Sequence, residues 1–233
     1  MRRFTSTVLV LLTAMALPTF GVAAPRGKKT PMPFEAAKMI IEFNSTDQDA
    51  GIQLSFDAEA WKNVTVLDPK GRTIFDVKPK GKLKTFGGSE LFLESDEPDL
   101  ADVSFADLFA RFPEGTYKFV GKSPDGENLE STATFSHKIP DGPSIVSPGT
   151  LDPAHAVIAW NPVTTPAGID VVGYEVVIEQ DDFHVFDIKV PGTTTSVTVP
   201  PEFLSPGTEY GFEVLAIDKG GNQTITASSF VTQ

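Results

Sequence analysis

Oxygen-bearing side chains follow one another closely from Asn44 to Gly51, in the segment Asn-Ser-Thr-Asp-Gln-Asp-Ala-Gly. Calcium loops place such ligands at alternate positions. Counted from Ser45 the first ligand types fit, but Gly51 comes one residue late and Phe56 stands where an EF-hand needs Glu. An EF-hand is therefore excluded. A looser site at Asp47 and Asp49 would need a second loop, for which 94–99 (Glu-Ser-Asp-Glu-Pro-Asp) is the best donor, yet the same residue types are also common in turns. We expect no bound metal.

The sequence contains few of the residues and motifs that other catalytic sites require. It has no cysteine, which excludes thiolate zinc sites and cysteine nucleophiles, and its three histidines (137, 155 and 184) are far apart. No Gly-x-Ser-x-Gly elbow is present. The glycine pairs at 87–88 and 220–221 lack the flanking strand, helix and lysine of a phosphate loop. Paired carboxylates that could hydrolyse a glycan must stand at a defined separation, which a sequence does not fix. We expect no enzyme activity and no cofactor.

The N-terminus carries an export signal. Arg2 and Arg3 precede an apolar run from Val8 to Leu17, and small residues follow at 21–24. This pattern predicts a signal peptide, residues 1–23, and a mature chain that begins at Ala24. An uncleaved anchor is the alternative, but the run is shorter than the ~20 residues that span a bilayer. The sequence thus predicts a secreted or periplasmic protein without stable membrane insertion after cleavage.

The charge is acidic and unevenly distributed. The chain has 31 acidic and 19 basic residues, a net charge of −12. Residues 141–233 contain 12 acidic residues against Lys189 and Lys219 alone. Such a segment repels phosphate backbones, so nucleic acid is excluded as a partner. The absence of cysteine from an exported protein favours a bacterial source.

The strand pattern predicts an all-β protein with two β-sandwich domains in series. Short runs rich in Val, Thr, Ile and Phe are separated by 19 Gly and 19 Pro spread along the chain. The segment 140–143, Pro-Asp-Gly-Pro, cannot lie inside a central strand and predicts a short linker. We therefore expect an N-terminal extension (24–37), a first sandwich (38–139), and a second sandwich (144–233).

The first sandwich is predicted to resemble an immunoglobulin-like fold with one short helix. Ser104 with Asp107 approximates a capping box, and Phe105, Leu108, Phe109 and Phe112 fall at helical spacing before Pro113. The run from Phe112 to Val120 echoes the Pro-Gly-Thr-x-Tyr pattern of the second sandwich. Tyr117 would then be a buried corner tyrosine.

The second sandwich resembles a fibronectin type III domain over nearly its whole length. Its signatures are Ala-Val-Ile-Ala-Trp-Asn-Pro at 156–162, Val-Gly-Tyr-Glu-Val-Val-Ile at 172–178, Thr-Ser-Val-Thr-Val at 195–199 and Leu-Ser-Pro-Gly-Thr-Glu-Tyr at 204–210. Alternation along these runs independently places large residues on one face. The predicted core residues are Trp160, Tyr174, Leu204 and Tyr210. The resemblance implies an extracellular recognition or spacer module, although this fold hosts many functions.

The same alternation predicts an outer face on this domain. If Tyr174 and its neighbours point inward, Glu175 and Val177 on one strand and Glu213 and Leu215 on another point outward. Phe183 and Val185 suit the outer face of the next strand. An apolar patch with an acidic rim suggests docking to another protein or to the first domain, unless loops cover it.

The sequence thus predicts a non-catalytic binding module whose partner is another protein or an extracellular polymer. Two alternatives stay open. One is a carbohydrate-binding or hydrolase-accessory protein, which would present exposed aromatics such as Trp61 in a groove. The other is a structural spacer without a ligand.

Overall fold

The computed structural model describes residues 30–147, 149–181 and 183–233. The predicted signal peptide and residues 24–29 of the extension lie outside the described residues. Among the described residues, no helix is both long and apolar enough to cross a membrane. The strands of the first part are β1 (Ala36–Asn44), β2 (Asp49–Trp61), β3 (Asn63–Leu67), β4 (Thr73–Val77), β5 (Gly88–Glu94), β6 (Gly115–Lys122) and β7 (Asn128–Phe135). Those of the second part are β8 (Ser144–Ile145), β9 (Thr150–Leu151), β10 (Val157–Asn161), β11 (Val171–Gln180), β12 (Phe183–Pro191), β13 (Ser196–Thr198), β14 (Glu209–Asp218) and β15 (Gln223–Thr232).

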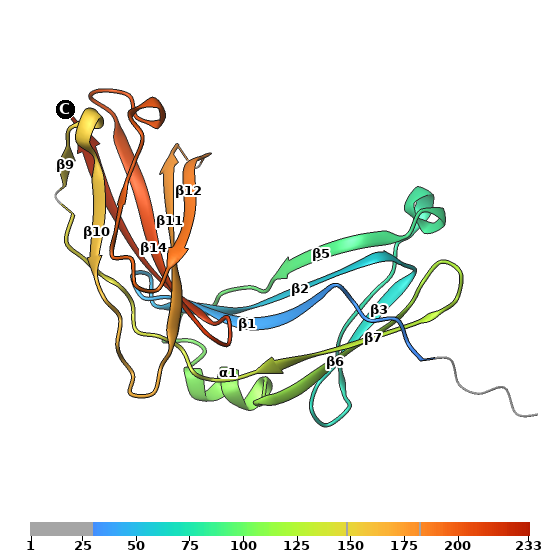
Figure 1. The fold of residues 1–233 in the computed structure, drawn as a ribbon. Coiled ribbons are helices and arrows are strands. Elements are labelled where there is room, and N and C mark those ends of the chain that lie inside the picture. Colours follow the sequence, from blue (N-terminus) through green and yellow to red (C-terminus); the bar gives the residue numbers. More distant parts are fainter. Residues whose placement is uncertain (1–29, 148, 182) are drawn as a thin grey trace, which may run out of the picture.

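One eight-stranded sheet runs through both halves of the protein, in the order β12-β11-β14-β15-β1-β2-β5, with β9 paired to the other end of β15. The two halves join where β1 pairs in parallel with β15, through Glu42↔Gln223, Phe43↔Thr224 and Asn44↔Ile225. Figure 1 shows this sheet bent sharply at the junction, with the two smaller sheets on its convex side. The sequence pattern did not predict a shared sheet.

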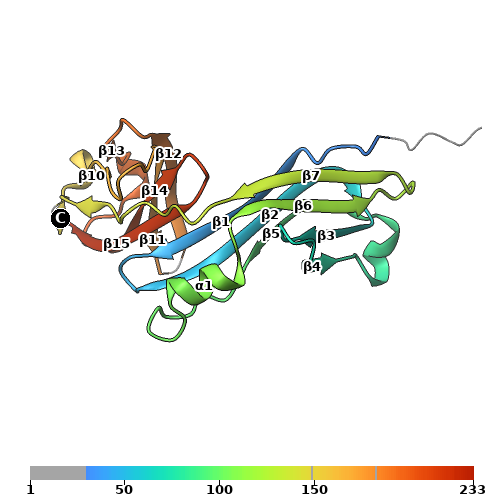
Figure 2. The same cartoon turned by 90° about the horizontal axis from the view of Figure 1, so that it is seen from below.

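Each half closes its own core with a smaller sheet. In the first half the sheet β4-β3-β6-β7 covers β1, β2 and β5, as Figure 2 shows from below. In the second half β13-β10-β8 covers β11, β14 and β15. The buried side chains form two separate large clusters, one within residues 34–135 and the other within residues 151–230. These clusters confirm the all-β prediction of two sandwiches.

The predicted helix is confirmed as α1 (Phe105–Arg111). The Ser104 hydroxyl caps its first turn by accepting a hydrogen bond from the Asp107 backbone N–H at 3.3 Å. Leu108 is buried, and the apolar face of the helix packs against the first core through Phe105 and Phe109. The helix therefore takes the place that its hydrophobic spacing predicts.

Three buried tyrosines use their hydroxyls to fix loops. The Tyr210 hydroxyl accepts a hydrogen bond from the Ser205 backbone N–H at 2.8 Å, and Tyr117 donates to the Pro113 carbonyl at 3.0 Å. Both geometries return the ring to the chain just upstream, as in a tyrosine corner. Tyr174 instead accepts from the Val163 N–H at 2.8 Å. The predicted core residues Trp160 and Leu204 are buried too, at 2% and 7% exposure.

Replacing Tyr210 by Phe should lower the free energy of unfolding by about 1 kcal/mol. The ring, 1% exposed, would keep its packing, while the Ser205 N–H would lose its acceptor. Urea denaturation followed by tryptophan fluorescence measures the difference. Stability equal to that of the parent protein would contradict a contribution from the corner hydrogen bond.

The junction between the halves is hydrogen-bonded through one side chain. Asn222 is 1% exposed and accepts from the Ile41 backbone N–H at 2.9 Å. Its amide nitrogen donates to the carbonyls of Ser136 at 3.0 Å and Lys138 at 2.6 Å. Thr224 also donates to the Pro140 carbonyl at 2.6 Å. Strand β1, the segment before the linker and the β14–β15 turn are therefore tied together. The boundaries at 38–139, 140–143 and 144–233 stay predictions.

Candidate functional site

The bent sheet leaves one face free of both cores, which we call the concave face. Alternation decides which side chains it carries, because each strand sends its other set of residues into a core. Strand β1 buries Met39 and Ile41 and turns Lys38, Ile40 and Glu42 to the concave face. In Figure 1 this face lies between β12 of the upright half and β5 of the nearly horizontal half. Two sandwiches thus contribute to one surface.

The concave face contains a hollow of about 500 Å³. The first half contributes Phe92, which is 61% exposed, and the second contributes Val172, which is 49% exposed. An ion pair between Lys189 and Glu175, 3.0 Å apart, crosses from β12 to β11 at its side. Apolar side chains surrounded by charged and amide groups are the composition of a protein–protein interface. The remaining lining residues are Lys38, Ile40, Gln53, Ser55, Ile217, Asp218, Lys219, Gly220, Gly221 and Gln223.

The predicted patch residues Val177 and Leu215 lie on this face but are buried. They are 6% and 5% exposed and form a small cluster with Ile225 of β15, separate from both cores. Sequence alternation predicted the correct face for these two residues but wrongly predicted that they are exposed. The bend brings the first half over this part of the sheet. Glu97 and Asp47 of the first half are close enough to Glu213 to interact with its charge. The exposed apolar residues of the concave face are therefore Phe92 and Val172 and not the predicted Val177 and Leu215.

The two predicted patch residues of β12 separate. Phe183 is 74% exposed, whereas Val185 packs, partly buried, against the second core. The prediction that Val185 faces outward is wrong. The pairing of β11 with β12 shifts register between Ile178 and Glu179, so no residue of β11 stands opposite Val185. Such a bulge breaks the alternation on which the prediction depended.

Three carboxylates meet at the junction end of the concave face. Glu42 on β1, Glu94 at the end of β5 and Glu97 in the loop that follows have carboxylate oxygens within 4.8 Å of one another. Glu42 is 7% exposed, and Gln223 of β15 donates a hydrogen bond to it. Burial raises the pKa of Glu42 to about 7, with further upward shifts from the charges of Glu94 and Glu97. At neutral pH Glu42 is thus only partly ionised.

Hydrogen bonds hold the loop after β5 against β2 and the turn before it. The Ser95 N–H donates to the Ile52 carbonyl and the Ile52 N–H donates to the Ser95 hydroxyl, each at 2.9 Å. The Leu100 N–H donates to the Gln48 carbonyl at 2.8 Å. Gly51 makes room for this approach, since a Cβ there would stand 2.8 Å from Cγ of Glu97. Burial raises the pKa of Glu97 to about 7, helped by the charge of Glu94. The loop therefore holds the Glu97 carboxyl in a partly buried position that disfavours its charged form.

The weak metal candidates Asp47 and Asp49 lie beside this cluster. Asp49 bridges to Asp99, so the loop 94–99 does come next to the hairpin 45–49 as a donor loop would. Asp47, however, accepts a hydrogen bond from Asn44 at 3.0 Å. Burial and the charges of Asp47 and Asp99 raise the pKa of Asp49. By donor type Glu42, Glu94 and Glu97 could hold a divalent cation, but burial in this crowded place raises the pKa values of Glu42 and Glu97, which disfavours the charged form that a cation needs.

Sequence reasoning missed Glu42, Phe92 and Lys38 as surface-site residues. Each lies on a strand of the first half, and the pairing of β1 with β15 brings the strands to the second half. One local signal was present. Glu42 interrupts the apolar run Met-Ile-Ile at 39–41 at a position that alternation turns away from the core.

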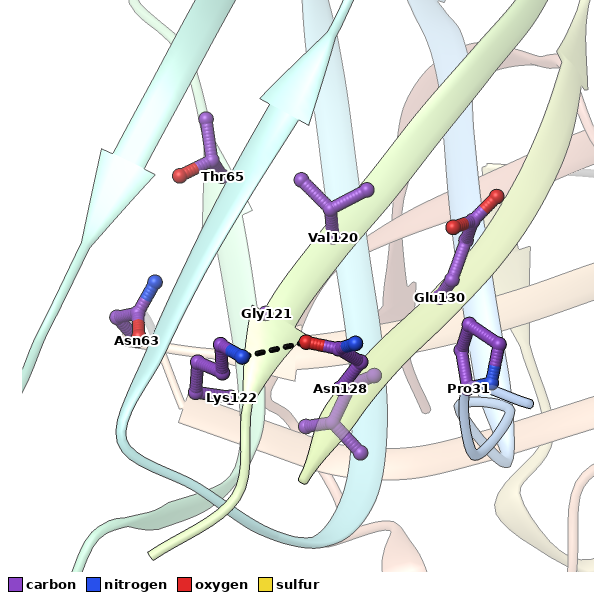
Figure 3. Close-up of a pocket in the computed structure, with 9 residues that line it drawn as sticks. Pro31, Asn63, Thr65, Val120, Gly121, Lys122, Asn128 and Glu130 are labelled. Carbon is purple, nitrogen blue, oxygen red and sulfur yellow. Dashed lines mark hydrogen bonds between the residues drawn. The ribbon is translucent and has the colours of Figure 1, made fainter. Parts of the chain in front are cut away.

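A second hollow, of about 410 Å³, lies on the outer side of β3, β6 and β7. Figure 3 shows Lys122 and Asn128 pointing toward each other across it, and Lys122 Nζ donates to Asn128 Oδ1 at 2.5 Å. Pro31 of the N-terminal extension closes one side. This hollow draws on the first half alone, whereas the concave face draws on both.

Comparison with known proteins identifies the second half. The family model of the fibronectin type III domain matches residues 143–232. Among solved structures, the FN1–FN3 domains of chicken CNTN1 are 12% identical, cover 87% of this chain and give a TM-score of 0.37. The Clostridium perfringens spore cortex lytic enzyme SleM is 14% identical, covers 40% of this chain and gives 0.31. The chain spans 65% and 28% of the lengths of these two proteins.

Proposed function

With a fibronectin type III domain as its C-terminal half, the protein is, we propose, a secreted or periplasmic, non-catalytic binding module. Fibronectin type III domains are generally interaction modules. The export signal read from residues 1–23 supports the location. The lack of cysteine and the scattered histidines support the absence of catalysis. Its partner is another protein.

The concave hollow is the observation that carries this proposal. Phe92 and Val172 stand 61% and 49% exposed on the two sides of one hollow, among charged side chains from both halves. Apolar contact in the middle and polar contacts around it are what a protein partner provides. The carbohydrate-binding alternative depended on Trp61 as the exposed aromatic, and Trp61 is 4% exposed and does not line the hollow. The concave face therefore favours a protein over a glycan.

Pull-down from an envelope extract tests the proposal with matched variants. We expect the mature parent protein to recover a protein partner, and Phe92→Asp with Val172→Asp to lose it. Phe183→Asp is the matched control, because Phe183 is 74% exposed on β12 and does not line the hollow. A partner retained by the double variant would overturn the concave face as the site. Recovery of no partner by the parent would favour the spacer alternative.

A further inference from the structure

The connection between β4 and β5 is positively charged, although the chain as a whole is negatively charged. Lysines stand at 78, 80, 82 and 84, and no acidic residue occurs between Asp76 and Glu90. The whole chain, by contrast, has a net charge of −12. All four lysines are exposed, and within the described part of the chain none of them forms an ion pair. We call residues 78–86 the basic loop.

Two large apolar side chains are exposed in the same loop. Leu83 is 63% exposed and Phe86 is 80% exposed. Residues 81–85 form a 3₁₀ helix with no buried residue, and Phe86 donates to the Leu83 carbonyl at 3.1 Å. Side chains three residues apart in this helix type eclipse each other, so Leu83 and Phe86 share one side. The flanking Lys82 and Lys84 then lie to either side of that apolar pair.

The basic loop lies at one end of the molecule. Gly81 and Gly87 take positive φ values of 56° and 79°, which lets the chain turn into and out of the helix. Lys84 and Lys62, which lies between β2 and β3, line the same hollow of about 390 Å³ beside the loop. Figures 1 and 2 show the turn, drawn in teal, at the end of the first half that is remote from the fibronectin type III domain. The loop can therefore contact an extended surface while the concave face stays open.

We infer that the basic loop attaches the protein to the surface of an anionic lipid bilayer, with its lysines at the headgroups and Leu83 and Phe86 in the interface. Each lysine near an anionic bilayer adds to the electrostatic attraction, and the transfer of apolar side chains out of water is favourable. A soluble polyanion would satisfy the lysines but would give Leu83 and Phe86 no apolar medium. The combination of both side-chain types is typical of an interfacial anchor.

Vesicle sedimentation of the mature protein tests this inference. Vesicles of phosphatidylcholine with phosphatidylglycerol should sediment the protein at low salt, and vesicles of phosphatidylcholine alone should not. High salt should release it, because the attraction is screened. Changing all four loop lysines to Gln should weaken binding on the order of a hundredfold or more, about fivefold for each lysine. Phe86→Ser should weaken it about tenfold.

Matched controls separate the loop from overall charge. Changing Lys70, Arg111, Lys118 and Lys138 to Gln removes the same charge from exposed positions elsewhere, and Phe183→Ser removes a similarly exposed ring from β12. Both controls should bind anionic vesicles like the parent. Thermal melts that match the parent would show that the loop variants are folded. Equal loss in loop and control variants, or binding to soluble polyphosphate but not to anionic vesicles, would overturn the lipid assignment.

Discussion

Replacing Asn222 by Ala should lower the free energy of unfolding of the mature protein by about 3 kcal/mol. The substitution would leave the Ile41 N–H and the carbonyls of Ser136 and Lys138 without their partner. A buried polar group that loses its partner costs about 1 to 3 kcal/mol, and water would satisfy part of the loss here. Urea denaturation with tryptophan fluorescence measures it, since Trp61 and Trp160 are buried in different halves.

Two controls isolate the junction. Asn161→Ala should have little effect, because the Asn161 side chain is exposed and its hydrogen bond to the Ser144 hydroxyl is long, at 3.4 Å. Residues 141–233 are predicted to fold alone, and there Asn222→Ala should be close to neutral, because all three partners lie outside the fragment. An equal loss in fragment and full chain would place the effect within the fibronectin type III domain instead of at the junction. A fragment without a cooperative transition would contradict the domain boundary.

The mature protein should become less stable as the pH rises from 5 to 8. The pKa of Glu42 is raised from 4.5 to about 7 in the folded state, so between these values the folded protein binds more protons than the unfolded chain. Stability from this group is fully present below pH 4.5 and is lost as the pH rises through about 7. Glu42 alone should contribute about 2 to 3 kcal/mol to the loss. Glu97 acts in the same direction, reduced by solvent screening.

Glu42→Gln tests this pH dependence. The amide cannot ionise, so the variant should lose most of the difference in unfolding free energy between pH 5 and pH 8 and should be more stable than the parent at pH 8. Glu97→Gln should reduce the difference by less. Glu202→Gln, in the exposed turn Pro201–Phe203, is the matched control. A Glu42→Gln variant that keeps the parent's full pH dependence would show that this carboxyl does not titrate as its surroundings require.

Local patterns predicted the elements and the cores of this protein. Alternation placed Tyr174 and Tyr210 inside, and the spacing of Phe105, Leu108 and Phe109 predicted α1, because strand and helix periodicity are properties of neighbouring residues. The same reasoning failed at Val185, where a bulge changed the count by one residue. Periodicity describes a regular strand and carries no signal for its interruptions.

The candidate site could be predicted only in part, because it depends on contacts far apart in sequence. Glu42 and Gln223 are paired across 181 positions, and no local pattern announces that β1 will join β15. Val177 and Leu215 were assigned to the correct face, but their burial depends on the bend that this pairing produces. The four alternating lysines of the basic loop stand in the sequence, but no site was predicted from them, because the argument for one depends on the exposure of Leu83 and Phe86.

A single sheet that runs through β15 and β1 should hold the two sandwiches in one fixed relative orientation. Residual dipolar couplings of backbone amides, measured on the mature protein in a weakly aligning medium, test this expectation. The shared sheet predicts that couplings from both halves fit one alignment tensor, with the relative orientation shown in Figure 1. Two tensors of different magnitude would show that the halves move independently, and the composite concave face would then not exist as a fixed site.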